Sequence, residues 1–267
     1  MSKLDTDLKN TENIRAYNRA AWDRQVENGN EWTVPSSDQV IEDARRGVWD
    51  VLLTDSKSVP RDWFPELDGL DVLCLASGGG QQGPVLAAAG ARVTVFDNSP
   101  RQLENDRIAA QRHNLDLTTV EGDMRDLSAF QDERFDLIFH PVSNIFVPDI
   151  RPVWNEAFRV LKHGGTMLAG IVNPVMYTFD EKLINDQGII QVKYSLPYSD
   201  VTSITEEERI DIYGPDDPLE FSHTLDDQLG GQIDAGFLIA GFYEDYRKDD
   251  PVRKYMPSYM ATKAAKP

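Results

Sequence analysis

Residues 71–83 decide the fold of this chain and read DVLCLASGGGQQG. An apolar run, Val72 to Ala76, leads into three consecutive glycines, Gly78 to Gly80. A stretch of small residues from Val85 to Ala89 follows, and a second apolar run from Arg92 ends at Asp97. This order predicts a strand, a glycine-rich loop, a helix, a second strand and an acid.

The loop and the acid of this unit are suited to binding a nucleoside. Glycines let the backbone approach a ligand closely, and the next helix presents its positive end to that ligand. A carboxylate after the second strand, here Asp97, is placed to accept hydrogen bonds from both ribose hydroxyls. Because Ser99 is expected to cap the next helix, the Asp97 carboxylate should be left for the ribose. The sequence therefore predicts a nucleoside-containing cofactor.

The composition narrows the class of protein. A chain of 267 residues, 40% of them hydrophobic, can form one large domain or a domain with a cap. No apolar run approaches the roughly 20 residues of a membrane span, and Met1 to Asn10 lacks the apolar stretch of a signal peptide. Cys74 is the one cysteine, which excludes a disulfide framework and a multi-cysteine zinc site. We expect a cytoplasmic protein without a metal site.

The charge of the chain disfavours nucleic acid as a partner. Its 27 basic and 45 acidic residues give a net charge of −18. Proteins that bind nucleic acids usually carry a basic face, and no dense run of Lys and Arg occurs here. We therefore expect a small-molecule substrate, with no nucleic-acid or membrane partner. The sequence carries no signal for a particular oligomeric state.

From residue 71 onward, strand-like and helix-like patterns alternate. Strands are predicted at 71–76, 92–96, 117–121, 135–140 and 166–172. Helices are predicted at 81–89, 99–113 and 151–162. This alternation implies parallel strands joined by right-handed crossovers.

Three helix ends carry sequence signals. A helix over residues 11–27 is expected to be capped by Thr11, and one beginning at Gln39 by Asp38. The glycines that follow His163 are expected to end the helix over 151–162.

The segments that flank the alternating core have a different character. Residues 1–60 are predicted to form a helical lid segment, in which aromatic residues such as Trp22 and Trp32, together with Tyr17, could cover a ligand. Residues 174–222 break the alternation and are predicted to be an insertion over the sheet edge.

The C-terminal part is predicted to complete the sheet. A helical pattern at 224–234 precedes two strand-like runs, at 237–244 and 258–262. Their short connection suits an antiparallel pair better than a crossover.

In their order and spacing, these motifs resemble the class I S-adenosylmethionine-dependent methyltransferases. The family's first motif, approximately VLDLGCGxG, stands here as VLCLASGGG from Val72 to Gly80. Gly122-Asp123-Met124 matches the segment beside the adenine, and residues 135–139 match the fourth strand. The resemblance covers residues 68–173 and, more loosely, 224–263.

The resemblance implies a fold and a function. The fold is a Rossmann-like three-layer α/β sandwich over residues 61–267, with a seven-stranded, mostly parallel sheet and an antiparallel last strand. The cofactor is S-adenosylmethionine, whose methyl group would pass to a small-molecule acceptor. Cofactor contacts are expected from Ala76, Ser77, Gly78, Gly80, Gln81, Gln82, Asp97, Asn98, Asp123, Met124 and His140.

His140 is the candidate general base. It ends the predicted fourth strand, where the family faces its substrate. An imidazole there could remove a proton from a hydroxyl, an amine or a carbon acid. A histidine that only shapes the pocket is the alternative interpretation.

Two departures from the family pattern leave other functions open. Cys74 stands where the family usually has an acid, and Ala76 where it usually has glycine. A non-catalytic cofactor-binding protein is therefore one alternative. The spacing Gly78-x-Gly80-x-x-Gly83 also fits the dinucleotide fingerprint, so an NAD-dependent oxidoreductase is the other.

Overall fold

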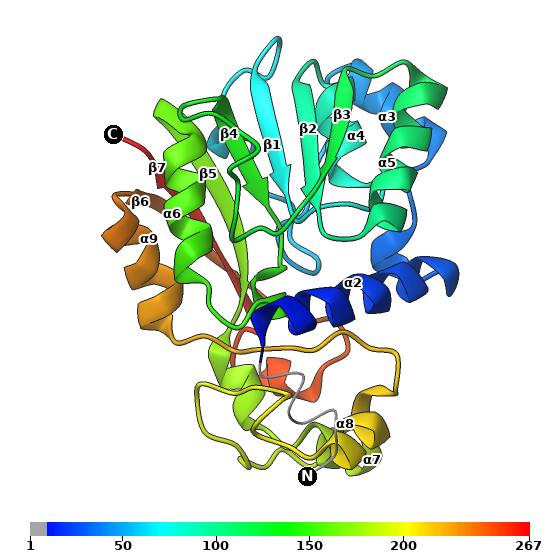
Figure 1. The fold of residues 1–267 in the computed structure, drawn as a ribbon, viewed down its shortest axis with the longest axis vertical. Coiled ribbons are helices and arrows are strands. Elements are labelled where there is room, and N and C mark those ends of the chain that lie inside the picture. Colours follow the sequence, from blue (N-terminus) through cyan, green and yellow to red (C-terminus); the bar gives the residue numbers. More distant parts are fainter. Residues whose placement is uncertain (1–9) are drawn as a thin grey trace.

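The computed structural model describes residues 10–267, which form an α/β sandwich of three layers (Figure 1). The middle layer is a seven-stranded sheet with the order β3-β2-β1-β4-β5-β7-β6. Strand β7 runs antiparallel to β5 and to β6, whereas the other neighbouring pairs are parallel. The predicted fold class and the antiparallel last strand are confirmed.

The strands are β1 (Asp71–Leu75), β2 (Arg92–Asp97), β3 (Leu117–Glu121), β4 (Phe135–His140), β5 (Leu161–Val172), β6 (Leu238–Asp245) and β7 (Tyr259–Ala265). The helices are α2 (Thr11–Glu27), α3 (Asp38–Arg45), α4 (Gln82–Ala88), α5 (Pro100–His113), α6 (Arg151–Val160), α7 (Glu181–Gln187), α8 (Glu206–Tyr213) and α9 (Gly231–Ala235).

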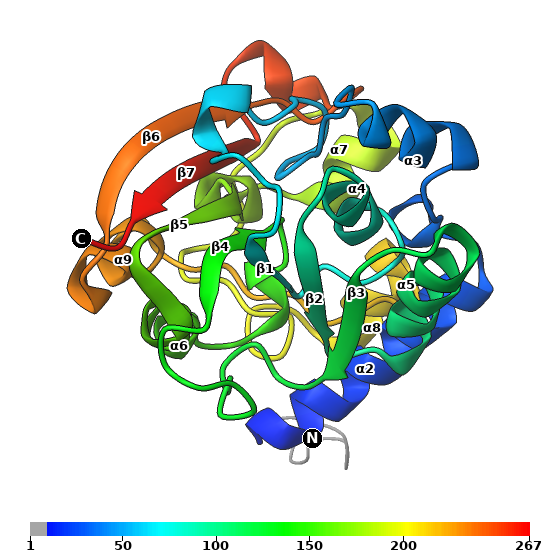
Figure 2. The same cartoon turned by 90° about the horizontal axis from the view of Figure 1, so that it is seen from above.

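The central strand β1 is buried along its whole length because helices cover both of its faces. Val72 and Cys74 pack on one face in a cluster that includes residues of α3, α4 and α5. Leu73 and Leu75 pack on the opposite face against α6. Figure 2 shows these two helical layers on either side of the sheet.

The structure corrects the predicted helix ends. Helix α2 is capped by Asn10 instead of Thr11, and α3 by Ser37 instead of Asp38, because the capping oxygen belongs to the residue before the first helical turn. Helix α6 ends at Val160 and β5 starts at the next residue. Gly164 therefore lies inside the strand, with a φ of +76°, and does not cap the helix.

The 174–222 segment lies beyond one end of the sheet and not along its edge. In Figure 1, α7 and α8 lie at the end of the molecule toward which the parallel strands run, and α2 crosses between them and the sheet. The side chain of Asn18 in α2 joins the two parts, because its Nδ2 donates to the carbonyls of Phe146 and Leu219, each at 3.0 Å.

The other predicted segments are close to their predicted places. The helical pattern at 224–234 is a short π-helical turn, Asp226–Gly230, followed by α9. Residues 1–9 of the predicted lid segment lie outside the described residues. Across residues 10–267, no helix combines the length and the apolar character needed to span a membrane.

Candidate active site

A cavity of about 360 Å³ opens at the carboxyl ends of the parallel strands. The loops that follow β1, β2, β3 and β4 form one side of it, and α2 and the 174–222 segment form the other. In open α/β sheets this end of the strands is where ligands bind.

Asp97, at the end of β2, holds the glycine loop that follows β1. Its Oδ2 accepts a hydrogen bond from the Gly78 N–H, and its Oδ1 accepts one from the Ser99 N–H, both at 2.9 Å. A Cβ at Gly78 would lie 2.7 Å from the Cβ of Gln102, so the loop needs glycine at this point. Ser99 caps α5 as predicted, and the Asp97 carboxylate, although it also accepts two backbone N–H groups, lines the cavity.

The acid that is missing at position 74 has a counterpart on helix α5. Asp106 is fully buried, and its Oδ2 accepts a hydrogen bond from the Gly79 N–H at 2.9 Å. Burial raises the pKa of Asp106 to about 8, so this carboxyl is largely protonated at neutral pH. Cys74 lies buried in the apolar core, and burial raises the pKa of its thiol. The loop is thus held by Asp106 of α5 together with Asp97 of β2, and not by a residue at position 74 of β1.

Two polar atoms in the cavity wall have no hydrogen-bond partner among residues 10–267. They are Oγ of Ser77 and Oε1 of Gln102, both buried. Both residues line the cavity. Because unpaired buried polar groups are rare and costly, they suit a site that a polar ligand completes.

Helix α2 is fixed to the ribose side of the cavity. Arg15 Nε donates to Oδ1 of Asn98 at 3.1 Å, and Asn98 Nδ2 donates to the carbonyl of Arg15 at 3.0 Å. Trp22 and Trp32 both line the cavity, as the lid interpretation predicts. Tyr17 is not part of the described cavity wall. Its hydroxyl donates to the carbonyl of Pro215.

Asp123 and Met124, which are predicted to contact the adenine, follow β3 and line the cavity. The Asp123 carboxylate is already paired, since Arg125 donates to it from Nη2 at 2.5 Å and from Nε at 3.1 Å. Although burial opposes it, this guanidinium keeps the pKa of Asp123 below its usual value. Arg125 also lines the cavity, and the sequence analysis missed it.

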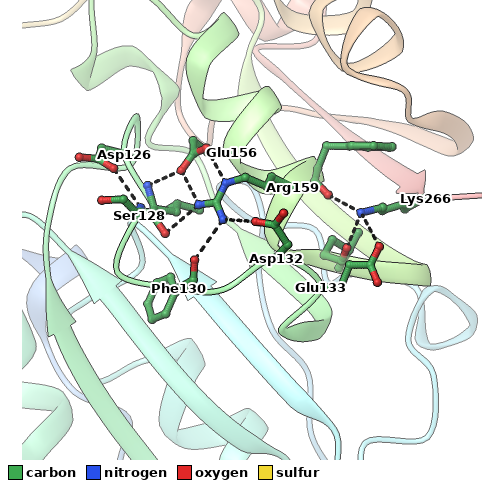
Figure 3. A network of polar contacts seen from close by, with 11 residues as sticks. Asp126, Ser128, Phe130, Asp132, Glu133, Glu156, Arg159 and Lys266 are labelled. Carbon is green, nitrogen blue, oxygen red and sulfur yellow. Dashed lines mark hydrogen bonds and ion pairs between the residues drawn. The ribbon is translucent and has the colours of Figure 1, made fainter.

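A polar network fixes the loop after β3 to helix α6 (Figure 3). Glu156 accepts a hydrogen bond from the Leu127 N–H at 2.8 Å. Arg159 donates to the carbonyls of Leu127 and Phe130 and forms ion pairs of 2.7 Å with Glu156 and Asp132. The segment that carries Asp123 is therefore supported from behind.

The structure does not place His140 where a base could act. Its side chain is fully buried and is not part of the described cavity wall. Nδ1 lies 2.8 Å from the carbonyl oxygen of Leu75, and Nε2 lies 2.5 Å from Oδ1 of Asn144. Burial lowers the pKa of the ring. These contacts favour the alternative interpretation, in which His140 only shapes the pocket.

The loop residues predicted to contact the cofactor differ in their position relative to the cavity. Ala76, Gln81 and Gln82 line the cavity, whereas Gly80 lies outside the described cavity wall, packed against Pro35. The amide of Gln81 donates to two backbone carbonyls of the 31–34 segment, and that of Gln82 accepts from the Leu52 N–H. Both glutamines therefore also anchor the N-terminal segment.

The far side of the cavity contains ionisable groups that the sequence did not reveal. The Tyr177 hydroxyl donates to Oε2 of Glu220 at 2.6 Å, and Arg247 Nε donates to the Tyr259 hydroxyl at 3.2 Å. Burial raises the pKa of Glu220 to about 7, and the nearby Asp200 adds to this shift. Residues 174–222 showed no motif, so no sequence signal singled out Tyr177 or Glu220. Arg247 and Tyr259 lie in the C-terminal part, for which the sequence analysis named no site residue.

Comparisons with known proteins agree with this geometry. A family model described as a methyltransferase domain matches residues 73–169. A Bacillus subtilis (strain 168) protein named Uncharacterized methyltransferase YbaJ is 53% identical over 251 residues, which cover 94% of this chain and 98% of that protein. The chain belongs to the class I S-adenosylmethionine-dependent methyltransferases. This membership makes it an enzyme that uses S-adenosylmethionine.

Solved methyltransferases share the fold at low sequence identity. An S-adenosylmethionine-dependent methyltransferase from Mesorhizobium loti aligns with a TM-score of 0.59 at 18% identity, covering 76% of this chain and 94% of that one. The 1,6-didemethyltoxoflavin-N1-methyltransferase of Burkholderia thailandensis aligns with a TM-score of 0.58 at 14% identity, covering 96% and 90%. Within residues 10–267, no group of three or more histidine, cysteine or acidic side chains is arranged to hold a metal ion.

Proposed function

We propose that this methyltransferase acts on a small molecule bound between the glycine loop and the 174–222 segment. One observation carries the proposal: a single cavity is lined by Asp97 and Asp123 on one side and by Tyr177 and Glu220 on the other. Its volume of about 360 Å³ lies within the range of small-molecule pockets.

The cofactor half of this cavity fits S-adenosylmethionine. Asp97 would accept hydrogen bonds from the ribose, and the unpaired atoms of Ser77 and Gln102 would gain partners. When bound, the cofactor supplies an electrophilic methyl group on a sulfonium. The residues proposed to hold it are Ala76, Ser77, Gly78, Gln81, Gln82, Asp97, Asn98, Gln102, Asp123, Met124 and Arg125.

The role of the protein is to bring the two reactants together and to exclude water. Helix α2 and the 174–222 segment cover the strand ends and are joined through Asn18. A confined site of this kind holds an acceptor close to the methyl group, which accounts for a large part of the rate enhancement in bimolecular transfer.

Calorimetry of the purified protein with S-adenosylmethionine, S-adenosylhomocysteine and NAD tests the proposal. We expect the first two to bind and NAD to give no heat. Asp97→Ala should weaken both affinities by at least about tenfold, which corresponds to about 1.4 kcal/mol, because the carboxylate also holds the Gly78 backbone.

A matched control is Asp116→Ala, which removes an exposed carboxylate from the turn before β3. It should bind S-adenosylhomocysteine as the wild type does. Binding of NAD alone, or wild-type affinity in Asp97→Ala, would contradict the assignment of this half of the cavity.

A further inference from the structure

Glu220 is an acidic group in the acceptor half of the cavity. It lines the cavity at the end of the 174–222 segment. Oε2 accepts the Tyr177 hydroxyl, and the backbone N–H of Glu220 donates to Oδ2 of Asp200 at 2.8 Å. Because the Tyr177 hydroxyl bonds to Oε2, the other carboxylate oxygen, Oε1, is available to meet a ligand.

The groups around Glu220 determine the pKa of its carboxyl group. Burial and the charge of Asp200 raise its pKa to about 7, whereas the Tyr177 hydrogen bond and Arg247 work in the opposite direction. A base is most effective when its pKa lies near the working pH. The charged and titratable groups that act on this site are Tyr177, Glu181, Asp200, Tyr213, Arg247 and Tyr259.

Part of the wall beside Glu220 is aromatic and apolar. Tyr177, Tyr259 and Phe146 belong to one cluster with Val172. Phe146 also meets the ring of Trp22 edge to face, with 5.1 Å between ring centroids. Such walls favour a flat, largely apolar molecule.

From these contacts we infer that Glu220 is the general base of the enzyme, and that the acceptor is a small aromatic molecule with an O–H or N–H group. The inference rests on the proposed function and names the acceptor class of the same cavity. Tyr177 positions the carboxylate through its hydrogen bond.

The proton transfer balances with the methyl transfer. Oε1 of Glu220 takes the proton of the acceptor O–H or N–H. The electron pair of that bond stays on the acceptor atom and forms its new bond to the methyl carbon, while the carbon–sulfur pair stays on sulfur. The negative charge of the carboxylate and the positive charge of the sulfonium disappear together, and Glu220 later releases its proton to water.

The test is a carbon-13 NMR titration of the full chain, labelled at the Glu carboxyl groups and saturated with S-adenosylhomocysteine. Glu220→Gln assigns the signal, and Glu207→Gln, an exposed position on α8, is the control. We expect the Glu220 signal to titrate at about pH 7. Tyr177→Phe should raise that midpoint, because the hydroxyl lowers the pKa of Glu220.

Two small probes then test the acceptor class on the same complex. Phenol donates a hydrogen bond and anisole, its methyl ether, cannot. Phenol should shift the Glu220 signal and bind at least about tenfold more weakly to Glu220→Gln, whereas Glu207→Gln should match the wild type. Anisole should bind the wild type and Glu220→Gln equally.

The results that would contradict the inference differ from the result that would contradict the proposed function. Titration of Glu220 near 4.5, unchanged phenol affinity in Glu220→Gln, or no phenol binding to the loaded wild type would each overturn the inference. If the wild type fails to bind S-adenosylhomocysteine, the proposed function itself is overturned.

Discussion

At the scale of single residues, Asp106, which holds the glycine loop, makes the stability of the protein depend on pH. The folded protein raises the pKa of this fully buried carboxyl to about 8, against an ordinary value of 3.8. Between these values the folded state holds a proton that the unfolded state has lost. The free energy of unfolding therefore falls as the pH rises through this window, by at most about 1.4 kcal/mol per pH unit for one proton.

Asp106→Asn should remove this contribution. The amide cannot ionise, yet its Oδ1 can still accept the Gly79 N–H. We expect urea denaturation between pH 5 and pH 8 to show a flatter stability profile in the variant than in the wild type. Glu220 titrates in both proteins, so the difference between the two profiles isolates Asp106. Parallel profiles would show that Asp106 is ionised in the folded state.

The residue scale also shows what local sequence can reveal. Gly78 follows β1 and Asp97 ends the adjacent strand β2. Both belong to one short stretch of sequence, so their motif can be recognised from the sequence alone. Asp106 meets the loop only because α5 packs beside β2, and Glu220 reaches the cavity only through the fold of a segment without a motif. Side chains brought together by packing leave no local pattern. For the same reason the sequence could not show that His140 is enclosed.

At the scale of elements, β5 depends on glycine at a crossing of two backbones. A Cβ at Gly170 would lie 1.9 Å from the carbonyl oxygen of Leu53 and 3.0 Å from the backbone nitrogen of Val142. The Val142 N–H donates to that same carbonyl, so neither backbone group can move away freely.

Gly170→Ala should therefore destabilise the protein by about 3 kcal/mol or more, as overpacking a rigid site does. Thermal unfolding measures the change. Gly230→Ala is the matched control, because Gly230 has a helical φ of −60° and a Cβ there would meet a carboxylate tip of the Asp226 side chain. The control should be neutral or slightly stabilising. Equal melting temperatures for the two variants would contradict the crossing described here.

Elements with strong periodicity were predicted well, and their ends less well. The first four strands, β1 to β4, lie within one residue of where the pattern placed them, because apolar runs between covering helices are distinctive. The start of β5 was missed, since Leu161 to Gly165 reads as a helix end although Leu161 pairs with Phe135 of β4 and Gly164 and Gly165 bond to the backbone of Lys266. Pairing partners far along the chain decided that boundary.

At the scale of the whole molecule, Asn18 joins α2 to the rest of the cavity wall. Its Oδ1 accepts a hydrogen bond from the Leu219 N–H at 2.7 Å, and its Nδ2 donates to the carbonyls of Leu219 and Phe146. Asn18→Ala should therefore lower hydrogen-exchange protection in α2 and in residues 214–222 together. Arg19→Ala, which removes an exposed ion pair with Glu121 from the same helix, is the control. Loss of protection in α2 alone would argue against a joint cover.

The position of α2 also bears on the kinetics of turnover. One helix of 17 residues contacts the cofactor half through Arg15 and Asn98 and the acceptor half through Asn18 and Leu219. Displacement of this helix would therefore break contacts to both halves of the cavity at once. Spent cofactor and methylated product would then leave after one shared opening step. The rate of that step would be an upper limit on the turnover rate of the enzyme.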